Sequence, residues 1–206
     1  NISMFILFLN KTIFLMKRIV ILGSGNGSNA ENIYNYFKGS KKISVVCFCT
    51  NNKQAYIVRR AKKIGIPCFF VTKEDFSNVS SPNSLFKRLK FDYLVLAGFL
   101  IKVPKEIVSL YPNKIFNIHP SLLPRHGGRG MYGEHVHRAV IKNKETKSGL
   151  TIHYVNNDYD KGKIIFQKSV SVKKGETTKE LKEKIHKLEL EFYPKIIESV
   201  ILKKCQ

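Results

Sequence analysis

The sequence predicts an α/β protein built on a doubly wound, Rossmann-like sheet that is mostly parallel, with an antiparallel addition near its C-terminal end. Short β-branched runs alternate with segments of helical spacing through most of the chain, as expected for parallel strands joined by crossover helices. A glycine-rich turn joins the first such run to the first helix. The last two apolar runs are separated only by a polar turn, which favours an antiparallel pair.

The length and composition of the chain suit one domain. It has 206 residues, 43% of them hydrophobic, which is enough for a full core. No repeat, linker or change in composition divides it, so we expect a single domain over residues 16–206. The apolar start before Asn10 is shorter than the ~18 residues that a membrane span needs. We expect residues 1–15 to be an extension upstream of a natural start at Met16; a signal peptide is the less favoured interpretation.

The first half of the chain alternates between strands and helices. Arg18–Leu22 is a β-branched run, and Ile33 and Phe37 give the following segment a helical spacing. The next helix is basic and ends at Gly65. The predicted elements are strand 18–22, helix 28–37, strand 43–50, helix 51–64 and strand 67–71.

The second half continues this alternation and then changes to paired strands. A loop and a helix are expected over residues 75–90. Pro104 starts a short helix at a position where proline is tolerated. Thr177 and Glu180 form a capping-box pattern for a closing helix, which we expect Pro194 to break. The remaining predicted elements are strand 93–97, strand 114–118, helix 134–141, strands 150–155 and 164–168, and a last helix from residue 194.

The chain is strongly basic, with a net charge of +21 and a pI near 9.9. Such an excess can indicate a nucleic-acid partner, because Lys and Arg attract phosphate backbones. Here the excess is mostly lysine spread along the whole chain, without a basic arm or an arginine cluster. We therefore favour a lysine-biased proteome as its cause, and we expect neither a nucleic-acid nor a membrane partner.

The four cysteines, Cys47, Cys49, Cys68 and Cys205, lack the CxxC spacing typical of zinc sites. Three of them fall in apolar, strand-like runs, which favours buried thiols in a reducing compartment over disulfides. We expect a cytoplasmic protein without a metal site.

Asn117 and His119 are the most informative pair of polar residues. They end an apolar run, and Pro120 stops the strand because proline lacks the donor that ladder pairing needs. Side chains two residues apart leave the same face of a strand, here at the end where open α/β sheets bind ligands. Asparagine can donate to an oxyanion, and histidine can carry a proton near neutral pH. The pair favours acyl-type transfer, although an isolated Asn-x-His is more often structural.

A glycine-rich loop, Gly23–Asn29, follows the first strand and opens the first helix. Its backbone N–H groups and the helix N-terminus can hold an anion, and phosphate is the expected guest. The loop lacks the Gly-Lys-Ser/Thr of a P-loop, and its third glycine is one position early for a dinucleotide fingerprint. Thr50 and Asn51 stand where a NAD site needs an acidic residue, so a monophosphate fits better than NAD. The alternative is an ordinary glycine turn.

Other candidates carry weaker signals. Asp160 lies in a turn between two predicted strands, where a carboxylate is either a turn residue or a base that assists His119. His153 is either a hydrogen-bonded core histidine or a site residue. Glu189, on the closing helix, has by itself the pattern of a solvated-face residue.

Four segments together resemble the phosphoribosylglycinamide formyltransferases, the folate-dependent enzymes of purine synthesis. They are Gly25–Asn29, Ala97–Leu100, Asn117–Pro124 and Asp160–Gly162, in the order in which that family has them. The resemblance covers residues 16–202 and implies the formyltransferase fold. It also implies transfer of a formyl group from 10-formyltetrahydrofolate to the amine of glycinamide ribonucleotide, by a protein that is a monomer or homodimer.

The resemblance also implies roles for individual residues. Asn117, His119 and Asp160 match the catalytic trio, in which Asn117 and a protonated His119 hold the oxyanion while Asp160 orients His119 and assists proton transfer. The ribose-binding carboxylate falls on Glu189. The phosphate loop falls on Gly25, Asn26, Gly27 and Ser28. The implied folate pocket is lined by Phe99, Leu100, Ile101, Lys102, Val103, Asn117, Val155, Asn156, Asn157, Asp158 and Tyr159.

Two features depart from the family pattern. Ile101 stands where many relatives carry a basic residue, and the loop Gly127–Gly133 is longer than in the shorter members. Both bear on folate affinity, and neither touches the catalytic trio.

Three alternatives stay open. Formyltetrahydrofolate deformylase and methionyl-tRNA formyltransferase share the catalytic core, but they usually carry a further N-terminal or C-terminal domain, for which we expect no room in this sequence. The third alternative is a basic nucleic-acid-binding module with a vestigial site.

Overall fold

The computed structural model describes residues 15–78, 81 and 84–203. Residues 1–14 of the expected extension, and Cys205, lie outside the described residues. The elements are β1 (Lys17–Leu22), α1 (Ser28–Phe37), β2 (Ile43–Thr50), α2 (Tyr56–Ile64), β3 (Cys68–Phe70), α3 (Lys73–Ser77), α4 (Leu85–Leu89), β4 (Tyr93–Leu96), α5 (Lys105–Leu110), β5 (Ile115–His119), α6 (Glu134–Lys142), β6 (Lys147–Tyr154), β7 (Ile164–Ser171) and α7 (Thr178–Ile201).

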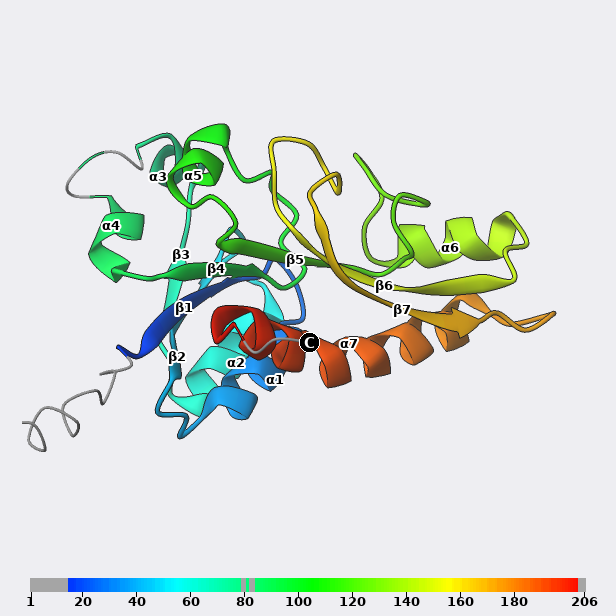
Figure 1. The fold of residues 1–206 in the computed structure, drawn as a ribbon, viewed down its shortest axis with the longest axis horizontal. Coiled ribbons are helices and arrows are strands. Elements are labelled where there is room, and N and C mark those ends of the chain that lie inside the picture. Colours follow the sequence, from blue (N-terminus) through cyan, green and yellow to red (C-terminus); the bar gives the residue numbers. More distant parts are fainter. Residues whose placement is uncertain (1–14, 79–80, 82–83, 204–206) are drawn as a thin grey trace, which may run out of the picture.

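The strands form one seven-stranded sheet with the order β3-β2-β1-β4-β5-β6-β7 (Figure 1). The pairings from β3 to β5 are parallel, and the β5–β6 and β6–β7 pairings are antiparallel. The doubly wound, mostly parallel sheet with an antiparallel C-terminal addition is therefore confirmed. The strand order reverses between β1 and β4, so their carboxyl ends form the switch point at which such sheets bind ligands.

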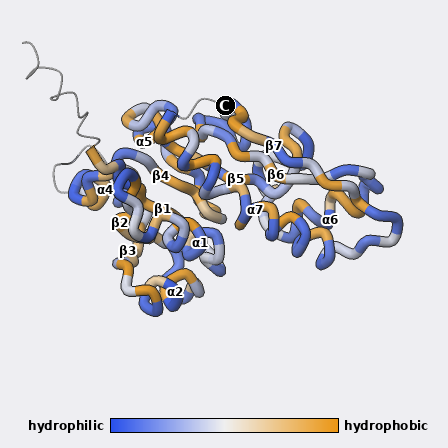
Figure 2. Tube along the Cα trace, turned by 60° about the horizontal axis from the view of Figure 1, so that its bottom comes forward, coloured by the Kyte–Doolittle hydropathy of each residue, from blue (hydrophilic) through white to orange (hydrophobic). Residues whose placement is uncertain are grey.

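Helices cover both faces of the sheet (Figure 1). Along β1, Ile19 and Ile21 belong to the core beneath α1, α2 and α7, whereas Val20 and Leu22 belong to the core beneath α3, α4 and α5. This alternation follows from the period of two in a strand that is buried on both faces. Figure 2 shows the consequence, with hydrophobic residues along the central strands and mixed hydropathy along α7.

The second helix is shorter than predicted. It begins at Tyr56, not Asn51, because the residues after β2 form a turn. In this turn the Asn52 side chain accepts from the Gln54 N–H at 2.9 Å, and its carbonyl accepts from Ala55 at 3.0 Å. Such local bonds from an asparagine compete with helix formation. The helix ends before Gly65, as predicted.

Other boundaries also differ from the prediction. The segment 73–89 holds two short helices, α3 and α4, because Thr72 and Asp75 form a capping box that starts α3. The paired strands β6 and β7 are longer than predicted and continue to Lys147 and Ser171, which pair with each other at the far end of the ladder.

Pro194 does not break the closing helix, contrary to the prediction. α7 runs without interruption from Thr178 to Ile201 and contains Pro194 as a buried residue. Proline lacks the N–H that would bind the carbonyl four residues earlier. Here that carbonyl, of Leu190, accepts from Asn32 Nδ2 of α1 at 2.7 Å. The partner from α1 removes the main cost of the proline, so the helix continues.

Cys47 and Cys49 are buried free thiols of β2, and Cys68 is a half-buried free thiol of β3. Burial raises the pKa of Cys68 to about 11. Of the helices described, none combines the length and the apolar character that a membrane crossing requires.

Candidate active site

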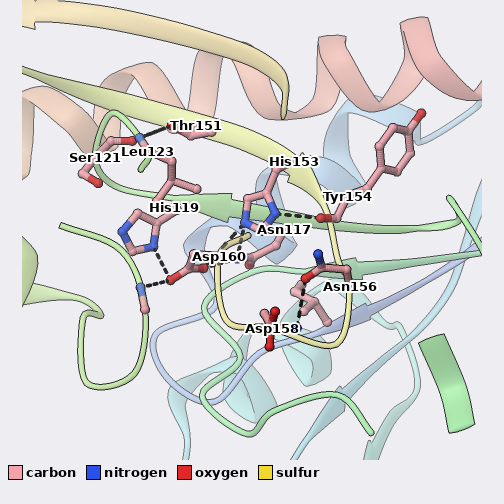
Figure 3. A network of polar contacts seen from close by, with 12 residues as sticks. Asn117, His119, Ser121, Leu123, Thr151, His153, Tyr154, Asn156, Asp158 and Asp160 are labelled. Carbon is pink, nitrogen blue, oxygen red and sulfur yellow. Dashed lines mark hydrogen bonds and ion pairs between the residues drawn. The ribbon is translucent and has the colours of Figure 1, made fainter. Parts of the chain in front are cut away.

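The site predicted from the sequence lies at the carboxyl ends of β1, β4 and β5. A cavity of about 570 Å³ opens there, within the size range of small-molecule sites. Asn117, His119 and Asp160 all contribute to its wall. The structure thus brings together the predicted catalytic side chains, which come from β5 and from the loop after β6 (Figure 3).

Asn117 is oriented by the neighbouring strand. It lies opposite His153 in the antiparallel register of β5 and β6, and its Nδ2 is 3.1 Å from His153 Nε2. The Tyr154 carbonyl, 2.8 Å from His153 Nδ1, can only accept, so Nδ1 carries a proton. His153 Nε2 then accepts from Asn117 and turns the amide nitrogen toward Asp160 Oδ1, 3.4 Å away. The amide therefore faces the cavity as a donor.

His119 is the last residue of β5 and is 3% exposed. Its Nε2 lies 2.8 Å from the carbonyl oxygen of His126, which can only accept, so Nε2 carries a proton. Its Nδ1 lies 3.5 Å from Asp160 Oδ2. Nδ1 is therefore the nitrogen that can exchange a proton, with the Asp160 carboxylate beside it.

Asp160 reaches this position because its loop passes very close to β6. A Cβ at Gly162 would overlap the Tyr154 carbonyl oxygen, so only glycine permits the approach. Asp160 Oδ2 accepts from the Gly128 N–H at 2.9 Å, and Oδ1 is 3.6 Å from His153 Nε2. The Asp-x-Gly pattern thus has a steric reason, and Asp160 is both a turn residue and the carboxylate of the site.

Burial and charge act in opposite directions on this cluster. Burial lowers the pKa of His119 below its ordinary value, although the Asp160 carboxylate and the His126 carbonyl act to raise it. Burial acts to raise the pKa of Asp160, but contacts with His153, His119 and Gly128 outweigh it, and the net shift is downward. Near neutral pH the ligand-free site therefore holds a neutral imidazole beside a carboxylate.

The glycine-rich loop after β1 reaches the cavity through Gly25. Arg60 of α2 lies behind the loop and donates to the Asn26 carbonyl and to the Asn26 side-chain oxygen, at 2.8 Å each. Gly27 precedes α1, which begins at Ser28. The predicted anion site therefore has a basic side chain next to it, which the sequence pattern does not reveal. Asn26, Gly27 and Ser28 lie outside the lining of the cavity.

Glu189 lies beside this loop, although 160 positions separate it from Asn29. Its Oε2 accepts from Asn29 Nδ2 at 2.9 Å and is 3.2 Å from His186 Nδ1. Asn29 Oδ1 and His137 Nδ1 are buried polar atoms without a hydrogen-bond partner among the described residues. The charges of both Glu189 and His119 act on His137. Polar groups thus continue from the loop toward His119, beyond the lining of the large cavity.

The predicted folate-binding segments line the cavity. The lining includes Phe99, Leu100, Ile101, Lys102, Val103, Asn117, Val155, Asn156, Asp158 and Tyr159. Asn157 is exposed and is absent from the lining. Lys102 Nζ lies 5.6 Å from the centre of the Tyr159 ring, so the two segments meet. Lys102 therefore places a cation next to Ile101 in the wall of the cavity.

The remaining wall comes from the long glycine-rich loop before α6. Residues 128–133 all line the cavity. Ser24 ties the opposite side together, because its Oγ accepts from the Leu100 N–H at 2.9 Å and donates to Asn51 Oδ1 at 2.5 Å. The first glycine-rich loop and the segment after β4 are thereby joined directly.

Three contributors are not identified by the sequence pattern. His153 is ambiguous until the β5–β6 register places it against Asn117. Arg60 and the Gly128 N–H have no motif of their own, because their roles depend on contacts between distant segments. No group of three or more His, Cys, Asp or Glu side chains that could hold a metal ion occurs within the described part of the chain.

Comparison with known proteins gives a consistent result. The formyl transferase family profile matches residues 17–197. The phosphoribosylglycinamide formyltransferase of Bacillus subtilis (strain 168) is 31% identical over 191 residues, which cover 90% of this chain and 95% of that protein. The chloroplastic phosphoribosylglycinamide formyltransferase of Arabidopsis thaliana is 37% identical over 190 residues, which cover 89% of this chain. The chain spans 65% of the length of this plant relative, less than two thirds.

Solved structures show the same likeness. The crystal structure of phosphoribosylglycinamide formyltransferase from Anaplasma phagocytophilum superposes with a TM-score of 0.81 at 32% identity. The match covers 93% of this chain and 90% of that one.

Proposed function

The chain belongs to the formyl transferase family, and from that premise we propose that it transfers the formyl group of 10-formyltetrahydrofolate to the primary amine of N1-(5-phospho-D-ribosyl)glycinamide. The products are the formylated ribonucleotide and tetrahydrofolate, and the reaction belongs to purine synthesis. The observation that carries the proposal is the convergence of Asn117, His119 and Asp160 on one wall of a largely apolar cavity.

The surroundings of the trio suit both substrates. Leu96, Phe99 and Val155 offer apolar surface for a flat ring system, and neighbouring loops offer polar backbone for its edges. On the other side, the backbone N–H groups of the glycine-rich loop suit a phosphate, and Arg60, which is paired with Glu31, supports the loop from behind. The Glu189 carboxylate suits the hydroxyl groups of a ribose. The amine of the ribonucleotide would then lie between these two regions, next to the trio.

Asn117 stabilises the oxyanion in this mechanism. When the amine attacks the formyl carbon, the formyl oxygen gains negative charge, which a preorganised amide N–H stabilises. His153 holds the Asn117 nitrogen in the donor orientation before substrate arrives. The second N–H, which lies 3.4 Å from Asp160 Oδ1 in the ligand-free site, then turns from that carboxylate to the oxyanion.

His119 and Asp160 carry out the proton transfer. The neutral imidazole accepts the proton of the attacking nitrogen at Nδ1, and the carboxylate at 3.5 Å stabilises the imidazolium that forms. The same pair returns this proton to N10 of the folate as the bond between N10 and the formyl carbon breaks. The bond between the attacking nitrogen and the formyl carbon remains as the new amide bond. His119 and Asp160 return to their initial protonation states.

A formyl-transfer assay on the whole chain tests the proposal. The consumption of 10-formyltetrahydrofolate is measured with and without the ribonucleotide. Consumption only in its presence, with stoichiometric formation of the formylated product, is the expected result. Consumption without it indicates hydrolysis and contradicts the proposal, as does consumption that requires methionyl-tRNA instead.

We expect Glu189→Gln to raise the KM for the ribonucleotide by about 10-fold or more, because a hydrogen bond to a charged group contributes about 1.5–3 kcal/mol. The KM for the folate should stay within about twofold, since the carboxylate lies beside the phosphate loop. Steady-state kinetics with each substrate varied in turn measures both values. Glu191→Gln, two positions along α7 at an exposed pair with Lys195, is the matched control. Equal effects on both KM values would contradict the assignment of Glu189.

We expect His119 to titrate below pH 6.5, because burial lowers its pKa despite the Asp160 carboxylate. In Asp160→Asn the midpoint should be lower still, since the nearest group that favours the imidazolium is gone. The measurement is an NMR titration of the histidine ring protons in the ligand-free protein, with His119 assigned by its loss in His119→Gln. A midpoint above 6.5, or an upward shift in Asp160→Asn, would contradict this electrostatic description.

A further inference from the structure

A three-residue segment, His126–Gly128, holds both proton-transfer groups through its backbone; we call it the bracket. The His126 carbonyl accepts from His119 Nε2 at 2.8 Å, and the Gly128 N–H donates to Asp160 Oδ2 at 2.9 Å. The position of the bracket therefore sets the orientation of the His119 ring and of the Asp160 carboxylate together.

His126 adopts a backbone conformation that is costly for a histidine. Its φ is 53°, in the left-handed region that residues other than glycine rarely adopt. The ring offsets this cost through a contact of its own, because Nε2 lies 3.2 Å from Glu145 Oε1. The His126 side chain is only 9% exposed. A buried imidazole that meets a carboxylate is thus what keeps the bracket in this conformation.

Glu145 connects the bracket to the rest of the fold. It lies in the turn between α6 and β6, and its N–H donates to the carbonyl of Val140, a buried residue of α6, at 3.2 Å. Its second carboxylate oxygen accepts from Arg125 Nη1 at 3.1 Å. The Glu145 carboxylate therefore binds both Arg125, which directly precedes the bracket, and His126, its first residue.

Gly127 packs closely against Leu123, whereas the His126 side of the bracket borders open space. A cavity of about 260 Å³ lies on this side, lined by His126, Glu145 and Ser148 among others. The Ser148 Oγ is buried and has no hydrogen-bond partner among the described residues. The polar restraints on this side are the contacts of Glu145 with His126 and Arg125 and the hydrogen bond of Ser121 Oγ to the Arg125 carbonyl at 2.7 Å.

We propose that Glu145 and His126 form a positioning pair for catalysis: Glu145 holds the His126 ring, and the bracket in turn keeps the His119 Nε2 proton and the Asp160 carboxylate oriented for proton transfer. Neither residue touches the substrates in this description. The kinetic consequence rests on the proposed formyl transfer, whereas the effect on the His119 ring exists without substrate.

Loosening the bracket changes the His119 titration in a defined direction. Burial lowers the pKa of His119, and the His126 carbonyl is one of the groups that oppose it. When that carbonyl moves away while the ring stays buried, the pKa of His119 is therefore expected to fall further. The other titratable groups that act on His119 are Asp160, His153, Glu189 and His137.

The test compares Glu145→Ala, Glu145→Gln and His126→Asn with the control Glu191→Gln. Glutamine keeps an acceptor for the His126 ring and should retain more activity than alanine. Asparagine tolerates a positive φ but is too short to reach Glu145. We expect kcat to fall about 10- to 100-fold in Glu145→Ala and His126→Asn, the scale of a small displacement of catalytic groups. Both KM values should stay within about twofold.

The decisive readout is the NMR titration of His119 in the ligand-free variants. A lower midpoint in Glu145→Ala and His126→Asn, with an unchanged midpoint in Glu191→Gln, supports the positioning pair. An unchanged midpoint in both variants, or a loss of kcat that follows only a loss of thermal stability, overturns it. If Glu145→Ala does not fold, Glu145→Gln and His126→Asn decide. If the wild-type chain shows no formyl transfer, the proposed function fails, and the titration still decides this inference.

Discussion

Asn117→Ala is expected to lower kcat for formyl transfer by about 10²–10³-fold, the usual effect of removing one oxyanion donor. The amide nitrogen is held at 3.1 Å from His153 Nε2, so it is oriented before the charge develops. Alanine leaves the formyl oxygen without this donor. The KM values should change much less, since the donor acts on charge that develops only in the transition state. Steady-state kinetics at saturating concentrations of both substrates measures the effect.

The control for Asn117→Ala is Asn143→Ala. Asn143 is an exposed residue that follows α6, remote in sequence from the trio. It should keep wild-type kcat within about twofold, as expected for a surface substitution away from special features. Thermal unfolding of both variants then separates lost chemistry from lost folding. Near wild-type kcat in Asn117→Ala, with normal stability, would rule out Asn117 as the oxyanion donor.

Asp160→Asn should reduce kcat by about 10³-fold, within the range that general acid–base groups contribute. The amide is nearly the same size and can still accept from the Gly128 N–H, which the carboxylate binds at 2.9 Å. It cannot take a proton, and it does not stabilise an imidazolium at His119. The loss should therefore be chemical, with the fold preserved.

Asp92→Asn is the matched control for Asp160→Asn. Asp92 accepts from the Arg18 N–H at 2.8 Å near the start of β1, and its side chain is 35% exposed. We expect unchanged kcat in this variant. If Asp160→Asn retained more than about a tenth of wild-type kcat while His119 titrated lower, the His119–Asp160 pair would not be the proton-transfer device.

The alternation of strands and helices follows from the sequence because each central strand is a continuous apolar run. β1, β2 and β4 are buried on both faces, and such runs do not depend on a distant partner to be recognised. The antiparallel pair β6 and β7 is also predictable, because a polar turn joins two apolar runs.

Element ends are less predictable, because distant residues determine them. α7 continues through Pro194 since Asn32, on another helix, binds the carbonyl that proline leaves free. α2 begins late because Asn52 forms a local turn that competes with the first helical turn. Helix propensity describes the free-energy cost of placing each residue in a helix. It does not identify the distant partner that offsets this cost.

The candidate site divides in the same way. Asn117 and His119 are recognisable from the sequence because Pro120 ends their strand and the period of two sends both side chains to one face. Asp160 has only a weak local signal, its Asp-x-Gly turn, and Glu189 is indicated only by resemblance. The roles of His153, Arg60 and the bracket depend on contacts across the fold.

By itself, the sequence determined the fold class, the positions of the strand-forming runs along the chain, and the pair Asn117 and His119. These features depend on local chemistry and on the periods of strand and helix. Only the tertiary structure decided that His153 orients Asn117, that Nδ1 of His119 faces Asp160, and that burial lowers the pKa of His119. The physical reason is that hydrogen-bond partners and burial depend on how segments distant in sequence are arranged in three dimensions. They arise where β5 pairs with β6 and where the loops before α6 and after β6 close over the strand ends.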